Sequence, residues 1–332
     1  MAWTTSATSW GRVPVTSNHR SRPRLRVARC PAQRPPGCLV SVISSLRQCN
    51  GGFADRCLCV SPKLARATRG GGMRLAGACA LVTGSTSGIG KGIAVGFGAE
   101  GAAVAVHGRN AERGAAVVSE IEEGGGKSRF FAADISEEGA CAELVEAVAE
   151  WAGGLTVLVN NAVGGSLGGV ETHDSKVGDM DTAHWESALR MNATAPMWLC
   201  RAAIPLMRAA GGGSIINVSS RQAERPSGGL SAYAASKGAM NALTRAIAVE
   251  YGGEGIRCNT ISPGYVLNER RDADITPERL ARFQGMHVTR LGEASDVAHA
   301  AVYLASDESG FLTGINLQLD GGSSIARALT IG

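Results

Sequence analysis

Long apolar runs, closely paired cysteines and N-terminal acidic residues are scarce in this chain of 332 residues. No run of about 18 apolar residues occurs, so we expect no transmembrane helix. None of the nine cysteines forms a Cys-x-x-Cys pair, and those after residue 70 lie far apart in apolar runs. We therefore expect buried thiols in a reducing compartment and no metal site. Glycine is abundant without a Gly-X-Y period, which predicts tight turns and excludes collagen.

Negative charge is almost missing from the first seventy residues, where eleven arginines and Lys63 stand against a single acid, Asp55. An Arg-rich, Ser-rich and acid-poor N-terminus is typical of an organelle transit peptide. We predict one over residues 1–72, directed to a plastid because its first ten residues are rich in hydroxyl groups, with a mitochondrion as the alternative. A disordered basic tail and a misassigned start codon are the other readings. The rest of the chain is mildly acidic, which argues against a nucleic-acid partner.

The chain beyond residue 72 alternates short apolar runs with stretches of helical spacing, such as Ile89, Ile93 and Phe97. The apolar runs are 78–82, 103–107, 130–132, 155–159, 215–218, 257–261 and 315–319. This alternation predicts one α/β domain over residues 73–332: a Rossmann-type, doubly wound, seven-stranded parallel sheet with about six helices on both faces. Two long loops, 163–181 and 265–291, are expected at the carboxyl ends of strands, where such sheets bind ligands.

A glycine-rich turn follows the first predicted strand and precedes an amphipathic helix. Glycines let the backbone approach a pyrophosphate closely, and the N–H groups and dipole of the helix favour the anion. A flexible connecting turn is the alternative reading. We predict cofactor contacts from the whole turn, namely Gly84, Ser85, Thr86, Ser87, Gly88, Ile89 and Gly90.

The second predicted strand ends in Gly108-Arg109-Asn110, without the carboxylate that would accept from a ribose hydroxyl and repel a 2′-phosphate. Arg109 offers a guanidinium to such a phosphate. We therefore predict a preference for NADP(H) over NAD(H), although Arg109 could be an ordinary exposed arginine. Asp134, which precedes Ile135 after the third strand, could accept from an adenine amino group or cap the next helix.

A second constellation has the composition of a proton-transfer site. Ser220 ends the fifth predicted strand, and Tyr233 and Lys237 share one helix face. A nearby ammonium would lower the pKa of the tyrosine from about 10, so that the phenol could exchange a proton with a carbonyl or alcohol. Tyr-x-x-x-Lys alone is weak evidence, because a solvated helix face can carry it. Its combination with the glycine turn and the strand-end serine is specific.

These motifs make residues 73–325 resemble the short-chain dehydrogenase/reductase family, in its branch of about 250 residues. The resemblance rests on the turn, Asn160-Asn161-Ala162, Asn192, Ser220, Tyr233-Ala-Ala-Ser236-Lys237, Pro263-Gly264 and Asp320-Gly321-Gly322. It implies metal-free hydride transfer between a nicotinamide and a carbonyl or secondary alcohol carbon, in a homotetramer or homodimer.

The same resemblance implies a role for each catalytic residue. Tyr233 is the acid/base, and Lys237 holds the nicotinamide ribose and lowers the tyrosine's pKa. Ser220 orients the carbonyl, and Asn192 supports a proton-relay water. Further cofactor contacts are expected from Asp134, Ile135, Asn161, Ala162, Tyr233, Lys237, Pro263, Gly264 and Val266.

Two departures from the family pattern concern this site. Val163 stands where the family usually has Gly and would narrow the site near the ribose; Asn268 replaces a common Thr and is expected to bond the carboxamide. The substrate is left as an unspecified small carbonyl or alcohol. One alternative is 3-oxoacyl-[acyl-carrier-protein] reductase of plastid fatty acid synthesis, with an acyl thioester substrate. The remote alternative is a non-catalytic dinucleotide-binding protein.

Several charged residues border the predicted cleft. Arg221 and Arg225 could meet an anionic substrate or pair with Glu224. Arg270 and Arg271 could meet an acidic partner such as acyl carrier protein. The lid is expected to be closed by Met286, His287 and Arg290, without a catalytic role for the histidine.

Overall fold

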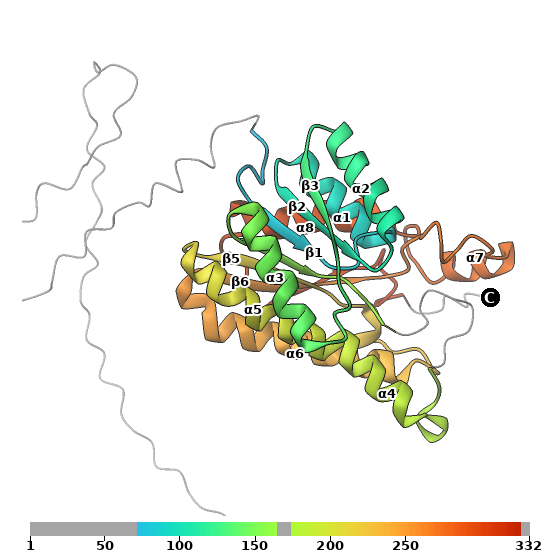
Figure 1. Ribbon diagram of the computed structural model, residues 1–332. Helices are drawn as coiled ribbons and strands as arrows, with labels where there is room; N and C mark the ends of the chain where they lie inside the picture. The colour runs from blue at the N-terminus through green and yellow to red at the C-terminus, as the bar shows by residue number, and fades with distance from the viewer. Residues whose placement is uncertain (1–71, 165–173, 327–332) are drawn as a thin grey trace, which may run out of the picture. The chain divides into compact units, whose positions relative to one another are not determined.

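Seven parallel strands form the centre of the domain that follows the predicted transit segment (Figure 1). The computed structural model describes residues 72–164 and 174–326. The predicted transit segment lies outside the described residues except for Gly72, and so does part of the first long loop. The strands are β1 Cys79–Val82, β2 Ala103–Gly108, β3 Lys127–Ala132, β4 Val157–Asn160, β5 Gly213–Val218, β6 Ile256–Pro263 and β7 Asn316–Leu319.

The strand order is β3-β2-β1-β4-β5-β6-β7, which confirms the predicted doubly wound sheet. The first strand, β1, lies in the middle of the sheet, and β2 and β3 follow on one side of it. The chain then crosses to the other side of β1, where β4 to β7 follow in order. Val82 therefore pairs with Val106 on one side and with Val159 on the other. The carboxyl ends of β1 and β4 flank the point where the connections diverge, and sheets of this type bind ligands there.

Eight α-helices lie in the described part of the chain, two more than the sequence predicted. The additional ones are short, α4 and α7, and each is started by local capping: Asp181 accepts from His184 N, and Thr276 accepts from Arg279 N. The helices are α1 Gly88–Ala99, α2 Ala111–Glu123, α3 Glu138–Ala152, α4 Thr182–Leu189, α5 Ala195–Ala209, α6 Ser231–Tyr251, α7 Pro277–Gln284 and α8 Ala294–Ala305.

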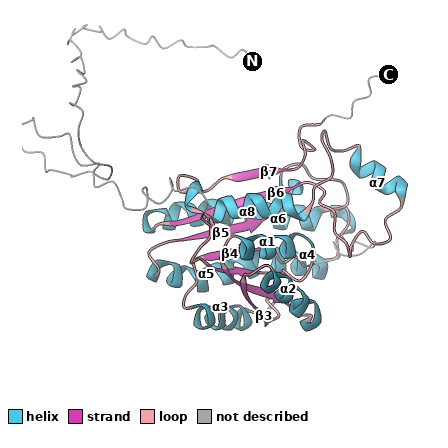
Figure 2. Ribbon diagram, turned by 90° about the horizontal axis from the view of Figure 1, so that it is seen from above, coloured by secondary structure: helices cyan, strands magenta, loops and turns pink. Residues whose placement is uncertain are grey.

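The period of two along each strand divides the core between the two faces of the sheet. Ala80 and Val82 join a cluster with α1, α2 and α8, whereas Leu81 joins a cluster with α3, α5 and α6. Leu81 is completely buried, and burying such a side chain contributes roughly 1.5–3 kcal/mol. The long helices therefore sandwich the sheet, while α7 lies apart from it, beyond the strand ends (Figure 2).

Every predicted strand exists, but β2, β3, β5 and β6 are longer than the apolar pattern indicated. β3 begins at Lys127 because a strand at the edge of the sheet tolerates polar residues such as Lys127 and Arg129. Cysteines 79, 141, 200 and 258 are unpaired thiols. Among the described residues no cluster of potential metal ligands occurs. No helix in these ranges has the length and hydropathy needed to cross a membrane.

Candidate active site

The glycine turn between β1 and α1 is held by bonds to the neighbouring strand ends. Gly84 has a φ of +64°, and its N–H donates to His107 Nδ1 at 3.1 Å. Ser85 N donates to the carbonyl of His107 at 2.9 Å. A Cβ on Gly84 would lie 2.8 Å from Ala162 Cα, so the turn also packs against the residues after β4. Glycine is therefore required here both by conformation and by space.

His107 is a supporting residue that sequence reasoning did not find. Because Nδ1 accepts from the turn, the ring proton lies on Nε2, which donates to Ala133 O at 3.2 Å. Burial lowers the pKa of His107 to about 4, so the imidazole is neutral at pH 7. From the sequence alone, His107 is expected only as the last residue of an apolar strand. No neighbouring residue indicates its contact with Gly84.

Several predicted cofactor residues brace the turn with their side chains. Asn161 Nδ2 donates to the carbonyls of Thr83 and Gly84, at 2.9 and 3.1 Å. Thr83 Oγ1 accepts from the N–H groups of Asn161 and Ala162. The buried hydroxyl of Ser85 donates to Val82 O and accepts from His107 N. Because Ser85 N also donates to His107 O, both the hydroxyl and the N–H of Ser85 are engaged within the protein.

The end of β2 offers an open position beside the turn. A Cβ on Gly108 would lie 2.6 Å from Thr86 Cγ2, so the two backbones approach closely. Arg109 is exposed and has no ion-pair partner among the described residues. Asp134 accepts from Ser136 N at 3.0 Å, and hydrogen bonds from Ser136 lower its pKa.

The alternative role of Asp134 as a helix cap is wrong, because the residue at the N-cap of α3 is Glu137. The side chain of Ile135 is buried in the core. A contact from Ile135 to an adenine ring would therefore use its backbone.

The proton-transfer residues converge from the end of β5 and the first turns of α6. Ser220 follows β5, and its hydroxyl accepts from Gln222 N and lies within hydrogen-bonding reach of the Tyr233 phenol. Lys237 Nζ donates to Val218 O at 2.8 Å and lies 5.8 Å from the centroid of the Tyr233 ring. The structure thus brings together the three residues that the sequence separated by up to seventeen positions.

The prediction that the pKa of Tyr233 is lowered is wrong. Burial raises the pKa of Tyr233, and the hydrogen bond with Ser220 and the charge of Arg271 oppose that rise only in part. Burial also lowers the pKa of Lys237 to about 7. Near neutral pH the amine is therefore only partly charged, which weakens the field that was expected to favour tyrosinate.

Asn192 lies in a π-helical turn, Arg190–Thr194, between α4 and α5. Its Nδ2 donates to Ser236 Oγ at 3.0 Å, and its Oδ1 accepts from Gly164 N at 3.1 Å. Ser236 Oγ in turn donates to the carbonyl of Tyr233. The buried amide therefore links the loop after β4 to the helix that carries the tyrosine, and π-helical turns of this kind are frequent at functional sites.

Asp174 supports the same helix and was missed in the sequence. Its carboxylate accepts from Ala232 N at 3.1 Å and from Tyr233 N at 2.8 Å, while the N-cap residue Leu230 makes no side-chain cap. A negative charge is favourable at this end of a helix. Asp174 and Ala232 are 58 positions apart, which explains why no local capping pattern revealed the contact.

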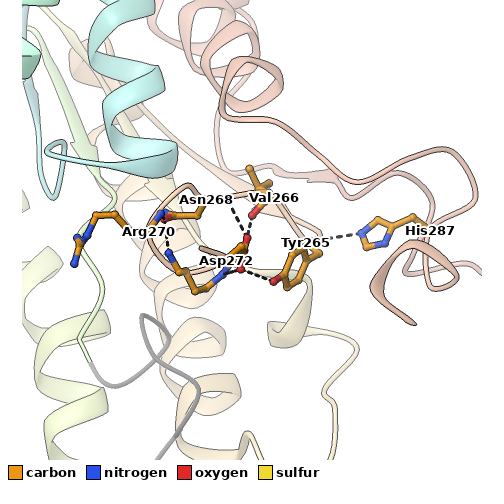
Figure 3. Close-up of polar contacts among 7 residues, drawn as sticks. Tyr265, Val266, Asn268, Arg270, Asp272 and His287 are labelled. Atoms are coloured by element: carbon orange, nitrogen blue, oxygen red, sulfur yellow. Dashed lines mark hydrogen bonds and ion pairs between the residues drawn. The ribbon is translucent and has the colours of Figure 1, made fainter. Parts of the chain in front are cut away.

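The long loop after β6 is organised by a partly buried carboxylate (Figure 3). Asp272 accepts from the Tyr265 hydroxyl at 2.7 Å, from Asn268 N at 2.9 Å and from the guanidinium of Arg271 at 2.7 and 2.8 Å. Arg271 also donates to Val266 O, and its guanidinium lies over the Tyr265 ring at 4.3 Å. The prediction that Arg271 is available to an acidic partner is therefore wrong.

Other predicted lid and rim residues serve the fold. His287 Nε2 accepts from Tyr265 N and its Nδ1 donates to Phe283 O, so both ring nitrogens are used. Arg290 pairs with Asp296. Glu224 accepts from Asn316 Nδ2 and Gln318 Nε2 and not from Arg221 or Arg225, so the expected rim pairing is wrong.

The remaining predicted residues lie where β4 and β6 end. Pro263 closes β6, and a Cβ on Gly264 would lie 2.8 Å from His287 Nε2 and 2.9 Å from Asp320 Cα. Val266 is buried, and Val163 is 45% exposed. Asn268 does not point freely to a carboxamide: its Oδ1 accepts from Arg270 N and Arg271 N.

Comparison with known proteins places this arrangement in a family. Residues 84–324 match a family model described as enoyl-(acyl carrier protein) reductase. The chain is 37% identical over 253 residues to 2,5-dichloro-2,5-cyclohexadiene-1,4-diol dehydrogenase LinX of Sphingobium indicum, covering 76% of this chain and 98% of that protein. The chain belongs to the short-chain dehydrogenase/reductase family.

Two solved structures of short-chain dehydrogenase/reductase proteins show the same likeness. One is 7α-hydroxysteroid dehydrogenase complexed with NADH and 7-oxo glycochenodeoxycholic acid, with a TM-score of 0.70 and 34% identity over 75% of this chain and 95% of that one. The other is 3-oxoacyl-(acyl-carrier-protein) reductase of Agrobacterium tumefaciens with NADP bound, with a TM-score of 0.69 and 31% identity over the same shares. The chain is an NAD(P)-dependent oxidoreductase acting on CH–OH groups.

The glycine turn fits the pyrophosphate of such a dinucleotide. The first N–H groups of α1 have no intrahelical partner, and no acidic residue lies in its first turn. A Cβ on Gly84, Gly88 or Gly90 would clash with Ala162, Asn268 or Asn161, so the glycines allow the turn to pack closely against its neighbours. Backbone donors and a positive helix end are the combination that binds phosphate.

Proposed function

We propose that the chain transfers a hydride between NADP(H) and a small carbonyl or secondary alcohol, with Tyr233 as the acid/base. The observation that carries the proposal is the cluster at the end of β5. There the Tyr233 phenol lies within hydrogen-bonding reach of the Ser220 hydroxyl, and the buried Lys237 amine lies 5.8 Å from the centroid of the Tyr233 ring. The cluster and the glycine turn both lie at the carboxyl ends of the parallel strands. A lost tyrosine, serine or lysine would favour the non-catalytic alternative, and all three are present.

The chemistry of the chain's own residues follows from this cluster. In reduction, the hydroxyls of Ser220 and Tyr233 donate hydrogen bonds to the substrate oxygen and polarise the carbonyl. A bound nicotinamide supplies or accepts the hydride. As negative charge develops on the oxygen, Tyr233 transfers its proton to it, and Ser220 and the Lys237 ammonium stabilise the resulting tyrosinate. Oxidation of an alcohol runs through the same groups in reverse.

The substrate class that we propose is a cyclic secondary alcohol or ketone. LinX and 7α-hydroxysteroid dehydrogenase are, by their names, dehydrogenases of hydroxyl groups on rings. A 3-oxoacyl thioester of acyl carrier protein is the second candidate, supported by the reductase among the similar structures. Plastid localisation, with a mitochondrion as the alternative, is proposed from residues 1–72, and a fluorescent fusion of that segment that stays cytosolic would contradict it.

The acid/base assignment is tested by Tyr233→Phe, measured on cyclic ketones and acetoacetyl thioesters by NADPH absorbance. We expect kcat to fall roughly 10²- to 10⁴-fold, the usual contribution of general acid–base catalysis, with the Kd for NADPH nearly unchanged. Tyr251→Phe, at the far end of the same helix, is the control and should keep wild-type turnover. Unchanged turnover in Tyr233→Phe would reject the assignment.

The cofactor preference is tested by Arg109→Asp. Replacing the guanidinium with a carboxylate should weaken NADPH by roughly tenfold or more, because a charge-assisted bond is lost and a like charge meets the 2′-phosphate. NADH should be affected little or bind more tightly. Kd values for both dinucleotides provide the measurement, and an unaltered ratio would show that Arg109 does not read the 2′-phosphate.

A further inference from the structure

The loop after β6 reaches across to the glycine turn. Arg270 Nη1 donates to Ser87 Oγ at 3.4 Å, although the two are 183 positions apart in the sequence. The amide of Asn268 lies against Gly88, where a Cβ would meet Nδ2 at 2.1 Å. Figure 3 shows the Arg270 side chain extending away from the Asp272 network. Two polar side chains of the loop therefore border the start of α1.

This placement is fixed by the rest of the loop. Asp272 anchors the Asn268 backbone and the Tyr265 hydroxyl, and Asn268 Oδ1 accepts from Arg270 N at 3.0 Å. The Tyr265 ring also stacks on Phe283 of α7, with centroids 3.9 Å apart. The backbone that carries Arg270 is consequently held by four neighbouring contacts, while its guanidinium remains exposed.

Charge distinguishes Arg270 from the other cations nearby. Lys91, in the first turn of α1, pairs with Glu120 at 2.9 Å, and Arg271 pairs with Asp272. Within the described ranges Arg270 has no carboxylate within ion-pair distance. An unneutralised guanidinium thus borders a helix N-terminus whose N–H groups are free to bind an anion.

We propose that Arg270 binds the pyrophosphate of the dinucleotide from the loop side, opposite the N–H groups of α1, with the Asn268 amide as a further donor. The proposal rests on dinucleotide binding at the glycine turn and adds a residue to that site. Because NADPH and NADH share the pyrophosphate, Arg270 contributes equally to both. Arg109, at the end of β2, would act only on the 2′-phosphate.

The experiment measures Kd for NADPH, NADH, ADP and adenosine 2′-monophosphate by fluorescence titration at two salt concentrations. The variants are Arg270→Gln, Arg270→Lys, and Arg282→Gln as a control that removes the same charge from exposed α7. We expect Arg270→Gln to weaken NADPH, NADH and ADP by roughly tenfold to a hundredfold, and adenosine 2′-monophosphate by less than twofold. Arg270→Lys should recover part of the loss, and Arg282→Gln should match the wild type.

Each other outcome overturns the proposal in a recognisable way. If Arg270→Gln binds all four ligands like Arg282→Gln, Arg270 does not contact the pyrophosphate, although the dinucleotide site stands. If it weakens NADPH and adenosine 2′-monophosphate but spares NADH, the guanidinium reads the 2′-phosphate. If the wild-type chain binds neither dinucleotide, the proposed function fails together with this inference.

Discussion

The two sides of the active site are built by different means. The cofactor side consists of backbone turns bonded directly to buried strand ends, as when Gly84 donates to His107 and Asn161 donates to Gly84. The loop side, from Tyr265 to His287, is held mainly by its own side chains around Asp272. The cofactor side is bonded to core strands, so it cannot open without disturbing the sheet. The loop side is bonded mainly to itself, so it can open locally while the sheet stays folded.

These two kinds of support determine where specificity can change in this fold. A substitution in the turn disturbs both cofactor binding and the sheet that carries it. A substitution in the loop changes the residues that border the glycine turn and the predicted cleft, and it leaves the core strands unchanged. Relatives that act on different ring alcohols and acyl chains are consistent with such a division between a fixed cofactor side and an adjustable loop side.

Gly84→Ala should show the largest effect and would test the claim that the turn belongs to the core. A residue with Cβ is strained at a φ of +64°, and the new atom would lie 2.8 Å from Ala162 Cα. Strain and overpacking together should lower the free energy of unfolding by roughly 2–5 kcal/mol. Denaturant titration measures the loss, and NADPH binding should weaken in parallel.

Gly139→Ala is the matched control for that substitution. Gly139 lies in α3, and a Cβ there meets nothing within 4 Å. Its replacement should stabilise the chain by about 0.5–1 kcal/mol through helix propensity. If Gly84→Ala were no more destabilising than this control, the turn would be independent of the core, and the two sides of the site would not differ in their support.

The pH dependence of the free energy of unfolding tests the role of His107, which supports the glycine turn on the cofactor side. The pKa of His107 is about 4 in the folded chain and about 6.5 when unfolded, so between these values the unfolded chain binds a proton that the folded chain does not. Stability should therefore fall as pH falls from 6.5 to 4, by about 3 kcal/mol from this residue. His107→Asn, which keeps an acceptor for Gly84 N, should remove that part of the slope; equal slopes would refute it.

The cofactor side was also the side that the sequence predicted best. Glycines between an apolar strand and an amphipathic helix have one common physical use, and the order of strands and helices set the sheet. The grouping of Ser220, Tyr233 and Lys237 was predicted from residue type, from the helical spacing of the last two and from the resemblance to the family.

What the sequence did not predict depends on long-range contacts. His107 looks like an ordinary strand residue, and Asp174 caps a helix that begins 57 positions later. The raised pKa of Tyr233 results from burial, which periodicity does not measure. In the loop, Arg271 was expected to be available to an acidic partner, but it donates to its neighbour Asp272. The sequence shows that the two charges are adjacent, but it does not show whether their side chains point toward each other or into solvent.

Asp272→Ala should have the smallest effect on the fold, and it tests whether the loop can open independently of the sheet. It removes the acceptor shared by Tyr265, Asn268 and Arg271. Because the network lies outside the main core, we expect local opening, with a loss of about 1 kcal/mol or less in global stability. Amide hydrogen exchange should become faster in residues 265–290. The KM for substrate should rise by a larger factor than the Kd for a 2′-phosphate ligand.

Asp274→Ala is the control, because it removes an exposed carboxylate from the same loop without disturbing the Asp272 contacts. It should leave amide exchange and KM at wild-type values. If Asp272→Ala instead lowered the midpoint of global unfolding as much as Gly84→Ala, the loop would be as much a part of the core as the turn. Specificity in this chain would then be tied to stability, and the loop could not vary independently of the sheet.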